Sequence, residues 1–382
     1  MVIEARLKIP LDSTVLNELV YEGLLYLIGK GFSESISFDT VELSDHAFVE
    51  AFSELDLEKI DKLSVVMSGN DNLNSRLLEL FKISETCKRT FRELLRILRN
   101  QSKFLDACRT SIEIRLREKR GKIYLGNGSE EDRLTAQIFK VDRYTGYSSL
   151  ESPYTSQQIT LYFSKEIALM LLLGIYSSFT TAVRVDRSVS YYFLFFSTDE
   201  LHVIFNDKSM ARKYIETRDV IEAQFSTVLR TRVNELLPII LSTNILITKQ
   251  LRAENLDKLS VSILKIDQEG QTYKIYENLQ LTAYRQPAFI KILEEFGKNP
   301  DFVIGRLNRA LSSDNVLFQA LTWRGRSDRG NAFRAIIGLH RFVANGDAQG
   351  WFTFVRELNN ARLKCESESS KKQYSYIIAG LV

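Results

Sequence analysis

The apolar stretch IALMLLLGIYSSFTTAV, residues 167–183, decides whether the fold is built in water or in a membrane. It has 17 residues, four Ser or Thr side chains in its second half, and the charged neighbours Lys165, Glu166 and Arg184. A bilayer span usually needs about 20 largely apolar residues. The stretch therefore predicts a buried core helix that runs into a strand, with a membrane span as the alternative.

Strand patterns continue after this stretch. A helical segment from Asp207 to Leu237 interrupts them and is expected to stop at Pro238. The strands expected on either side of it, from short apolar or alternating runs, are 182–196, 201–205, 239–248, 259–266 and 271–279.

The region before the stretch mixes both periodicities. Residues 2–9 alternate apolar and charged side chains as a half-buried strand does, and residues 15–31 carry a helical apolar face. We further expect strands at 35–43 and 62–68 around a short helix at 45–54. Helical structure is expected over 72–117, with a possible break near 100–102. A two-stranded ribbon at 121–142 and an exposed connection at 144–158 follow.

Strand signals fade after residue 286. Five runs bounded by Pro, Gly, Asn or Asp fit short helices: 287–298, 300–313, 315–323, 330–346 and 351–364. The fold class predicted is α+β, a mixed α/β body with antiparallel sheet regions and a helical C-terminal bundle. The expected domains are an N-terminal α/β region with a basic helix (1–150), a second strand-rich α/β region (151–285) and a helical C-terminal domain (286–382).

Composition favours an ordinary soluble protein. The chain has 382 residues, of which 45% are hydrophobic and 26% charged, values that allow a large core and exclude disorder as the main state. The three cysteines form no CxxC pair, and residues 1–14 lack the pattern of a secretory signal. We therefore expect a reducing, cytoplasmic location.

Charge is unevenly distributed although the net charge is only +3. Residues 1–60 hold four Lys or Arg against twelve Asp or Glu, residues 82–122 thirteen against five, and residues 306–341 seven against two. Within RTFRELLRILRN and the residues after it, steps of three and four place five cations in one row of a helix. This basic row consists of Arg89, Arg92, Arg96, Arg99 and Lys103.

The basic row favours an external polyanion, because like charges three or four residues apart repel unless a partner compensates them. The alternative is that the acidic N-terminal region folds back and neutralises the row. EIRLREKRGKIYL, expected at the exit of the same helix, continues the basic segment with residues suited to phosphate contacts. These residues are Arg115, Arg117, Lys119, Arg120 and Lys122.

A second candidate lies in LTWRGRSDRGNAFR, where arginines alternate with aromatic residues and glycines. Guanidinium groups suit phosphate or guanine contacts, and an indole stacks on bases. The alternative is a loop between helices whose arginines pair with Asp314, Asp328 or the acidic N-terminal third. The residues assigned here are Trp323, Arg324, Arg326, Arg329 and Arg334.

Signals for catalysis are weak. His46, His202 and His340 are far apart in sequence; His202 is expected inside the strand at 201–205. The glycine-rich GNGS at 126–129 lacks the Lys and Ser or Thr of a phosphate-binding loop and is interpreted as a hairpin turn. We therefore expect that the protein is not an enzyme and that it has no catalytic residues, no metal and no cofactor.

The order of elements, with YEGLLYLIGKGF at 21–32 and RLNRALSSDNVLFQALTWRGRSDRGNAFRAIIGLHRFVANGD at 306–347, resembles the large subunit of archaeal type I-A CRISPR interference complexes (Cascade). The resemblance covers most of the chain as a pattern of elements, without an invariant motif. It implies a non-catalytic subunit for antiviral defence that contacts the guide RNA handle and target DNA and checks the target-adjacent motif. Its implied partners are the other effector subunits and a helicase-nuclease. A stand-alone DNA- or RNA-binding protein and a structural scaffold remain as alternatives.

Overall fold

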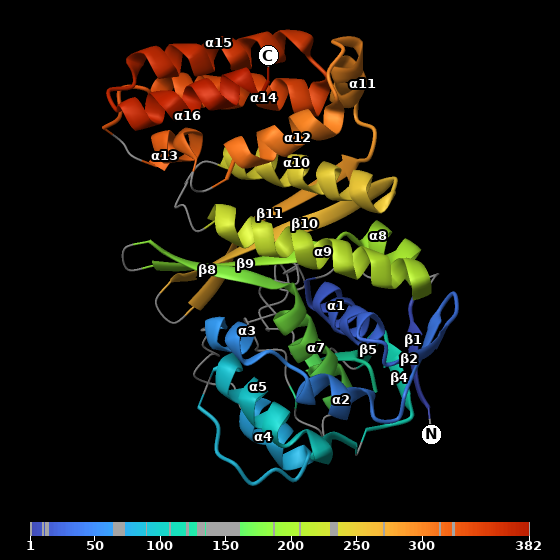
Figure 1. Ribbon diagram of the computed structural model, residues 1–382. Helices are drawn as coiled ribbons and strands as arrows, with labels where there is room; N and C mark the ends of the chain where they lie inside the picture. Colours follow the sequence, from blue (N-terminus) through green and yellow to red (C-terminus); the bar gives the residue numbers. More distant parts are fainter. Residues whose placement is uncertain are drawn as a thin grey trace, which may run out of the picture. The chain divides into compact units, whose positions relative to one another are not determined.

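The computed structural model describes most of the chain as two compact units (Figure 1). Unit 1 comprises Met1–Glu216 and Val261–Gln280, and unit 2 comprises Thr217–Ser260 and Leu281–Val382. The described residues are 2–9, 11, 15–63, 73–88, 90–106, 108–119, 122–127, 134, 161–185, 188–205, 208–229, 236–269, 272–312, 315–322 and 325–381. The three domains expected at 1–150, 151–285 and 286–382 stay a prediction; the compact units group residues 217–260 with the C-terminal helices.

The described strands form three sheets, and the mixed α+β class is confirmed. The first sheet has the order β2-β3-β1-β4, in which β1 is antiparallel to β3 and parallel to β4. Its strands are β1 (Ile3–Leu7), β2 (Ser33–Ile36), β3 (Thr40–Leu43) and β4 (Ser111–Ile114).

The second sheet has the order β5-β6-β7 and the third the order β11-β10-β9-β8. In the third sheet, β8 and β10 both run antiparallel to β9. The strands are β5 (Leu116–Lys119), β6 (Lys122–Leu125), β7 (Leu161–Phe163), β8 (Phe179–Val185), β9 (Ser188–Phe196), β10 (Lys258–Glu269) and β11 (Thr272–Tyr284).

The apolar stretch at 167–183 is a core helix that runs into a strand, as predicted. It forms α7 (Lys165–Ser178), whose first turn is capped by Ser164 at 3.4 Å from the Ile167 amide, and continues directly into β8. Every residue from 166 to 178 is buried. Within the described ranges, no helix is both long enough and apolar enough to cross a bilayer.

Two glycines let α7 pack tightly against α1 (Val15–Gly29). A Cβ placed at Gly23 would lie 1.9 Å from the Met170 carbonyl oxygen, and one at Gly174 would lie 1.7 Å from that of Leu19. The two backbones therefore meet where neither helix has a side chain. Glu22 of α1 is also buried and accepts a hydrogen bond from the Phe196 amide of β9 at 2.7 Å, which ties the helix to the third sheet.

The remaining described helices up to residue 229 are short, except for α9, which has 22 residues. They are α2 (Ala47–Ser53), α3 (Leu57–Lys62), α4 (Leu73–Leu80), α5 (Phe91–Asn100), the 3₁₀ helix η1 (Ser102–Asp106), α8 (Thr198–Ile204) and α9 (Lys208–Leu229).

Unit 2 contains the helical C-terminal region, and all five helices predicted there are present. α14 packs against α15 at Gly338 and Gly350, and α15 packs against α16, which the sequence did not predict (Figure 1). The helices are α10 (Leu236–Glu254), α11 (Ala288–Glu295), α12 (Pro300–Ala310), α13 (Val316–Thr322), α14 (Arg329–Asn345), α15 (Ala348–Lys364) and α16 (Glu368–Ala379).

Two predicted strands are wrong because they are helices. Residues 239–248 lie in α10, where Pro238 is in the first turn and therefore begins rather than stops a helix. The hydroxyls of Ser242 and Thr243 donate to the Ile239 carbonyl at 3.0 and 2.7 Å, so polar groups in the apolar run are satisfied within the helix. Residues 201–205 belong to α8 and its end, so His202 is helical and not in a strand.

The helical expectation over 72–117 is wrong at its end. α5 and η1 stop by Asp106, and β4 and β5 follow. Ile112 and Ile114 are buried on alternate positions, which is the period of a strand. The ribbon expected at 121–142 is instead β5 with β6, and most of its remainder lies outside the described residues. The strand expected at 62–68 is wrong at its start, because Lys62 ends α3; its residues from 64 onward and the connection at 144–158 also lie outside the described residues.

Candidate nucleic-acid interface

The basic row starts on α5, whose first turn is fixed by Thr90. The Thr90 hydroxyl accepts a hydrogen bond from the Glu93 amide at 3.2 Å, and the Glu93 carboxylate accepts one from the Lys88 amide at 2.9 Å. The apolar side of the helix is buried through Phe91, Leu94, Leu95, Ile97 and Leu98. The arginines therefore lie on the opposite, polar side, as the spacing predicts.

The described arginines of the row have three different environments. Arg96 forms an ion pair with Asp61, both about half-exposed, and Arg99 donates through Nε to the Leu55 carbonyl at 2.9 Å. Arg92 is exposed and has no ion-pair partner among the described residues. Of these arginines only Arg96 is neutralised by a carboxylate, that of Asp61, which directly follows the acidic stretch 1–60; Arg89 lies outside the described residues.

Lys103 lies on η1 and not on the same helix as the arginines. Its ammonium is 5.3 Å from the centroid of the Phe104 ring, and both side chains are exposed. Nearby, His46 contacts Asp106 at 3.0 Å, and this hydrogen bond, with Asp45, raises the pKa of His46. The end of the row is thus an exposed surface of mixed charge, in which Lys103 and Phe104 lie near an imidazole that is paired with carboxylates.

The second basic segment lies on a ribbon instead of a helix exit. Arg115, directly before β5, and Lys119, the last residue of β5, are exposed and have no ion-pair partner in the described part of the chain. Arg117 donates to the Gly126 carbonyl and lies 3.7 Å from Glu113. Lys122 lies 5.7 Å from the Tyr162 ring centroid, and Arg120 is outside the described residues.

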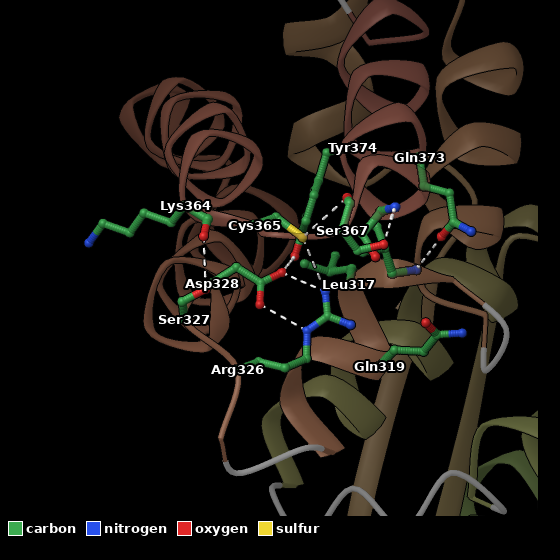
Figure 2. A network of polar contacts seen from close by, with 12 residues as sticks. Leu317, Gln319, Arg326, Ser327, Asp328, Lys364, Cys365, Ser367, Gln373 and Tyr374 are labelled. Carbon is green, nitrogen blue, oxygen red and sulfur yellow. Dashed lines mark hydrogen bonds and ion pairs between the residues drawn. The ribbon is translucent and has the colours of Figure 1, made fainter.

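The loop before α14 is held by a polar network that Figure 2 shows from close by. Arg326 donates from Nε and Nη2 to both carboxylate oxygens of Asp328 at 2.9 and 2.7 Å, and the Tyr374 hydroxyl donates to the same carboxylate at 2.9 Å. Asp328 is 1% exposed. Burial alone would raise the pKa of Asp328, but the hydrogen bonds from Arg326 and Tyr374 hold it below its ordinary value.

The same network fixes neighbouring groups. Ser327 donates to the Lys364 carbonyl at 2.8 Å, and Arg326 reaches the Cys365 sulfur at 3.7 Å (Figure 2). Burial is the main reason why the pKa of Tyr374 is raised. Of the two alternatives at this loop, pairing with Asp328 accounts for Arg326; Trp323 and Arg324 lie outside the described residues, and Arg329 begins α14 half-buried.

Arg334 on α14 belongs to a second polar network, which links α14 to α15. Its Nε donates to Glu357 at 3.0 Å, and Arg356 donates to the other oxygen of Glu357 at 3.3 Å. Asn331 adds a hydrogen bond at 2.8 Å. Burial opposes ionisation of Glu357, yet these donors lower its pKa, so one buried carboxylate orients two guanidinium groups that are both more than half-exposed.

Arg356 was missed by sequence reasoning. Its only local signal was the pair Arg356 and Glu357 in WFTFVRELNNARLK, which resembles any solvated helix face. Arg356 and Arg334 are linked only through Glu357, and the pair of Arg334 with Glu357 depends on how α14 packs against α15. Such a pair cannot be inferred from spacing along one helix.

No catalytic constellation is evident in the part of the chain that the structure describes. No group of three His, Cys, Asp or Glu side chains there has the geometry to hold a metal ion. His202 lies edge-on to Phe38 at 5.7 Å between centroids, and burial lowers the pKa of His340. Burial also raises the pKa of Cys87 to about 12, which keeps this thiol protonated.

Comparison with known proteins gives one informative relative. No family model matches the chain, and no solved structure matches it. An uncharacterized protein of Archaeoglobus fulgidus is 40% identical over 378 residues, which cover 97% of this chain and 96% of that protein. The chain therefore belongs to the same protein family as this Archaeoglobus fulgidus protein.

Proposed function

We propose that the chain is a non-catalytic, nucleic-acid-binding subunit of a larger assembly. The observation that carries this proposal is a set of exposed cations in unit 1 without carboxylate partners among the described residues. They are Arg92 on α5, Arg115 between β4 and β5, and Lys119 on β5. Cations that the fold leaves uncompensated are the groups that displace counterions from a phosphate backbone.

The neighbouring cations support the same role. Arg96 is paired with Asp61, but both groups are about half-exposed, and an exposed pair of this kind is worth less than about 1 kcal/mol. A phosphate can therefore compete for Arg96 at little cost. Lys103 is exposed beside Phe104 and extends the cationic surface toward η1.

The resemblance to the large subunit of type I-A interference complexes gives the proposal its specific form. The assembly would be a Cascade complex in the cytoplasm, and the ligands would be the guide RNA handle and target DNA, with a helicase-nuclease as a further partner. The relative in an archaeon agrees with an archaeal system. A stand-alone DNA- or RNA-binding protein would show the same exposed cations, but it would bind tightly without guide RNA.

A structural scaffold is the second candidate, and one observation favours it. In unit 2, Arg326 and Arg334 are paired with the buried carboxylates of Asp328 and Glu357. These two arginines therefore have a structural role that needs no ligand. For a scaffold, the exposed cations of unit 1 would contact acidic protein surfaces instead of phosphates.

Charge-matched variants separate these functions. Arg92→Gln/Arg115→Gln/Lys119→Gln removes three uncompensated cations, whereas Arg212→Gln/Arg285→Gln/Arg341→Gln removes three arginines that are already paired with Glu216, Asp257 and Asp347. Fluorescence anisotropy at low salt measures how tightly each variant binds duplex DNA and guide-type RNA. We expect at least tenfold weaker binding for the first variant and a smaller change for the second. Equal binding by the two variants would contradict the proposed interface.

A further inference from the structure

An arginine next to two exposed aromatic rings marks a separate surface of unit 2. Arg306 lies on α12, with its Cζ 5.1 Å from the centroid of the Phe302 ring and 4.6 Å from that of the Tyr376 ring on α16. Phe302 is 53% exposed and Tyr376 59% exposed. We call these three residues the Arg306 platform. Two largely exposed rings around one cation are more than the scattered apolar side chains of an ordinary surface.

The guanidinium of the platform lacks an anionic partner among the described residues. Its Nη1 atom is buried and has no hydrogen-bond partner there. The nearest acid along the helix, Asp301, is instead paired with Arg252 at 2.5 Å. Because Nη1 is shielded from solvent, a phosphate would pair with the guanidinium through its other nitrogens, where no carboxylate among the described residues competes with it.

The backbone of Gly380, at the end of α16, fixes the guanidinium of Arg306. A Cβ at Gly380 would lie 3.1 Å from both Cδ and Nε of Arg306, so the arginine rests directly against the backbone after α16. The rings and this contact orient Arg306 before any ligand arrives. Preorganisation of this kind reduces the entropy cost of binding.

Further cations lie along the same helix faces. Arg309 is three residues after Arg306 on α12, and Lys372 is four residues before Tyr376 on α16; both are exposed. Residues at these spacings share a face of a helix. Glu368, the one acidic residue of α16, is paired with Lys371 at 2.6 Å. The platform therefore combines exposed π faces with a surplus of positive charge.

We propose that the Arg306 platform binds single-stranded nucleic acid, with bases stacked on Phe302 and Tyr376 and a phosphate held by Arg306. Unpaired bases expose the faces that stack on aromatic side chains, whereas the bases of a duplex do not. The cations serve the backbone of the same strand. This inference rests on the proposed function, because it takes nucleic acid as the partner of the chain, but it uses a different surface from α5 and β5.

An acidic protein segment is the competing ligand. It would pair with Arg306 through a carboxylate, but it would gain little from two exposed aromatic faces. The rings favour the flat bases of a single strand, and the experiment includes a polyglutamate peptide so that the two ligands give different results.

The test measures binding of the full chain to an oligo(dT) of about 20 nucleotides and to a duplex of the same length by fluorescence anisotropy. We expect Phe302→Ala and Tyr376→Ala each to weaken oligo(dT) binding by about tenfold, with duplex binding unchanged and Tyr376→Phe close to wild type. Arg306→Gln should lower the salt slope on oligo(dT) by about 0.7. Tyr284→Ala is the matched control, because Tyr284 is 53% exposed and lies on β11.

Each outcome has a defined meaning. If the wild type binds oligo(dT) and both alanine variants bind it equally well, the platform proposal is overturned while the proposed function stands. If the ring variants lose polyglutamate binding and keep oligo(dT) binding, the platform is a protein-docking surface and the proposal is also overturned. If the wild type binds neither nucleic acid, both the proposed function and this inference fail.

Discussion

Asp328 is the residue on which the ordered loop before α14 depends. Its carboxylate is 1% exposed and receives hydrogen bonds from Arg326 and Tyr374. A buried carboxylate that loses its charge leaves the arginine beside it uncompensated, and breaking such a pair is strongly destabilising. Arg326 therefore stabilises the fold through Asp328, whether or not the loop also contacts a ligand.

We predict that Asp328→Asn lowers the free energy of unfolding by about 2–4 kcal/mol at pH 7. Tyr374→Phe removes one hydrogen bond to the same carboxylate and should cost about 1.5–3 kcal/mol. Arg341→Gln breaks the more exposed pair with Asp347 and should cost less than about 1 kcal/mol. Denaturant titrations measure all three; equal losses for Asp328→Asn and Arg341→Gln would contradict the role of the buried network.

Glu18 predicts a pH dependence of stability in unit 1. Burial, and then the neighbouring carboxylate of Glu22, raise the pKa of Glu18 to about 7. Between its unfolded pKa and pH 7 the folded chain holds a proton that the unfolded chain has released, so stability falls as pH rises through this window. Glu18→Gln removes this loss and should be more stable than wild type at pH 8 by up to about 3 kcal/mol.

Urea titrations at pH 5 and pH 8 measure this difference for wild type, Glu18→Gln and the exposed control Glu54→Gln. Wild type and Glu54→Gln should lose stability between the two pH values by more than Glu18→Gln does. If the stability of wild type changes between pH 5 and pH 8 in the same way as that of Glu18→Gln, the Glu18 carboxylate is not buried as described.

Individual partners were only partly predictable from the sequence. Asp328 was named as one alternative partner for the arginines of its loop, and its pairing with Arg326 is present. The pairs Arg96 with Asp61 and Arg334 with Glu357 join residues 35 and 23 positions apart. Spacing along one element carries no information about such contacts, because they depend on which helices become neighbours.

At the scale of elements, the pairing of α1 with α7 depends on two glycines. We predict that Gly23→Ala or Gly174→Ala lowers the free energy of unfolding by about 3 kcal/mol or more, because the added Cβ would meet a backbone carbonyl of the other helix that cannot rotate away. Gly305→Ala is the control, since nothing lies within 4 Å of its Cβ position on α12 and alanine favours helix by up to about 1 kcal/mol.

Thermal and denaturant unfolding of these three variants test the helix pairing. We expect a loss of stability for Gly23→Ala and Gly174→Ala and no loss for Gly305→Ala. If all three glycines tolerate alanine equally, the close approach of α1 to α7 is wrong.

Elements with strong periodicity were predictable, and apolar runs without it were not. α5 and α12 have clear caps and amphipathic faces, and both were expected. The run at 239–248 has apolar residues on both sides of a polar Ser-Thr-Asn segment and no clear period, so its sequence fits a buried strand and a buried helix equally. α8 carried the capping pattern of Ser197 with Glu200, whose amide lies 3.3 Å from the serine hydroxyl, and this signal outweighs the apolar run after it.

For the whole molecule, the order of strand and helix patterns indicated the fold class but not how the chain divides into compact units. α9, β10 and β11 each continue from one compact unit into the other, so the boundaries of the units do not coincide with changes in sequence pattern. Charge segregation was visible in the sequence. Its outcome, a basic row that is partly paired and partly exposed, required the structure.

If exposed cations of unit 1 bind a nucleic-acid backbone, binding must depend on salt through those cations. The dependence is measured as the slope of log affinity against log salt for duplex DNA, by fluorescence anisotropy. The slope counts the counterions released and therefore the phosphates contacted. Arg99 is left unchanged in the variants, because its hydrogen bond to the Leu55 carbonyl holds the fold.

We predict that Arg92→Gln/Arg115→Gln/Lys119→Gln makes the slope shallower by about two to three units, while the charge-matched Arg212→Gln/Arg285→Gln/Arg341→Gln variant keeps a slope within about one unit of wild type. Identical slopes for the wild type and the first variant would show that these cations contact no phosphate. That result would contradict the proposed function and favour the structural scaffold.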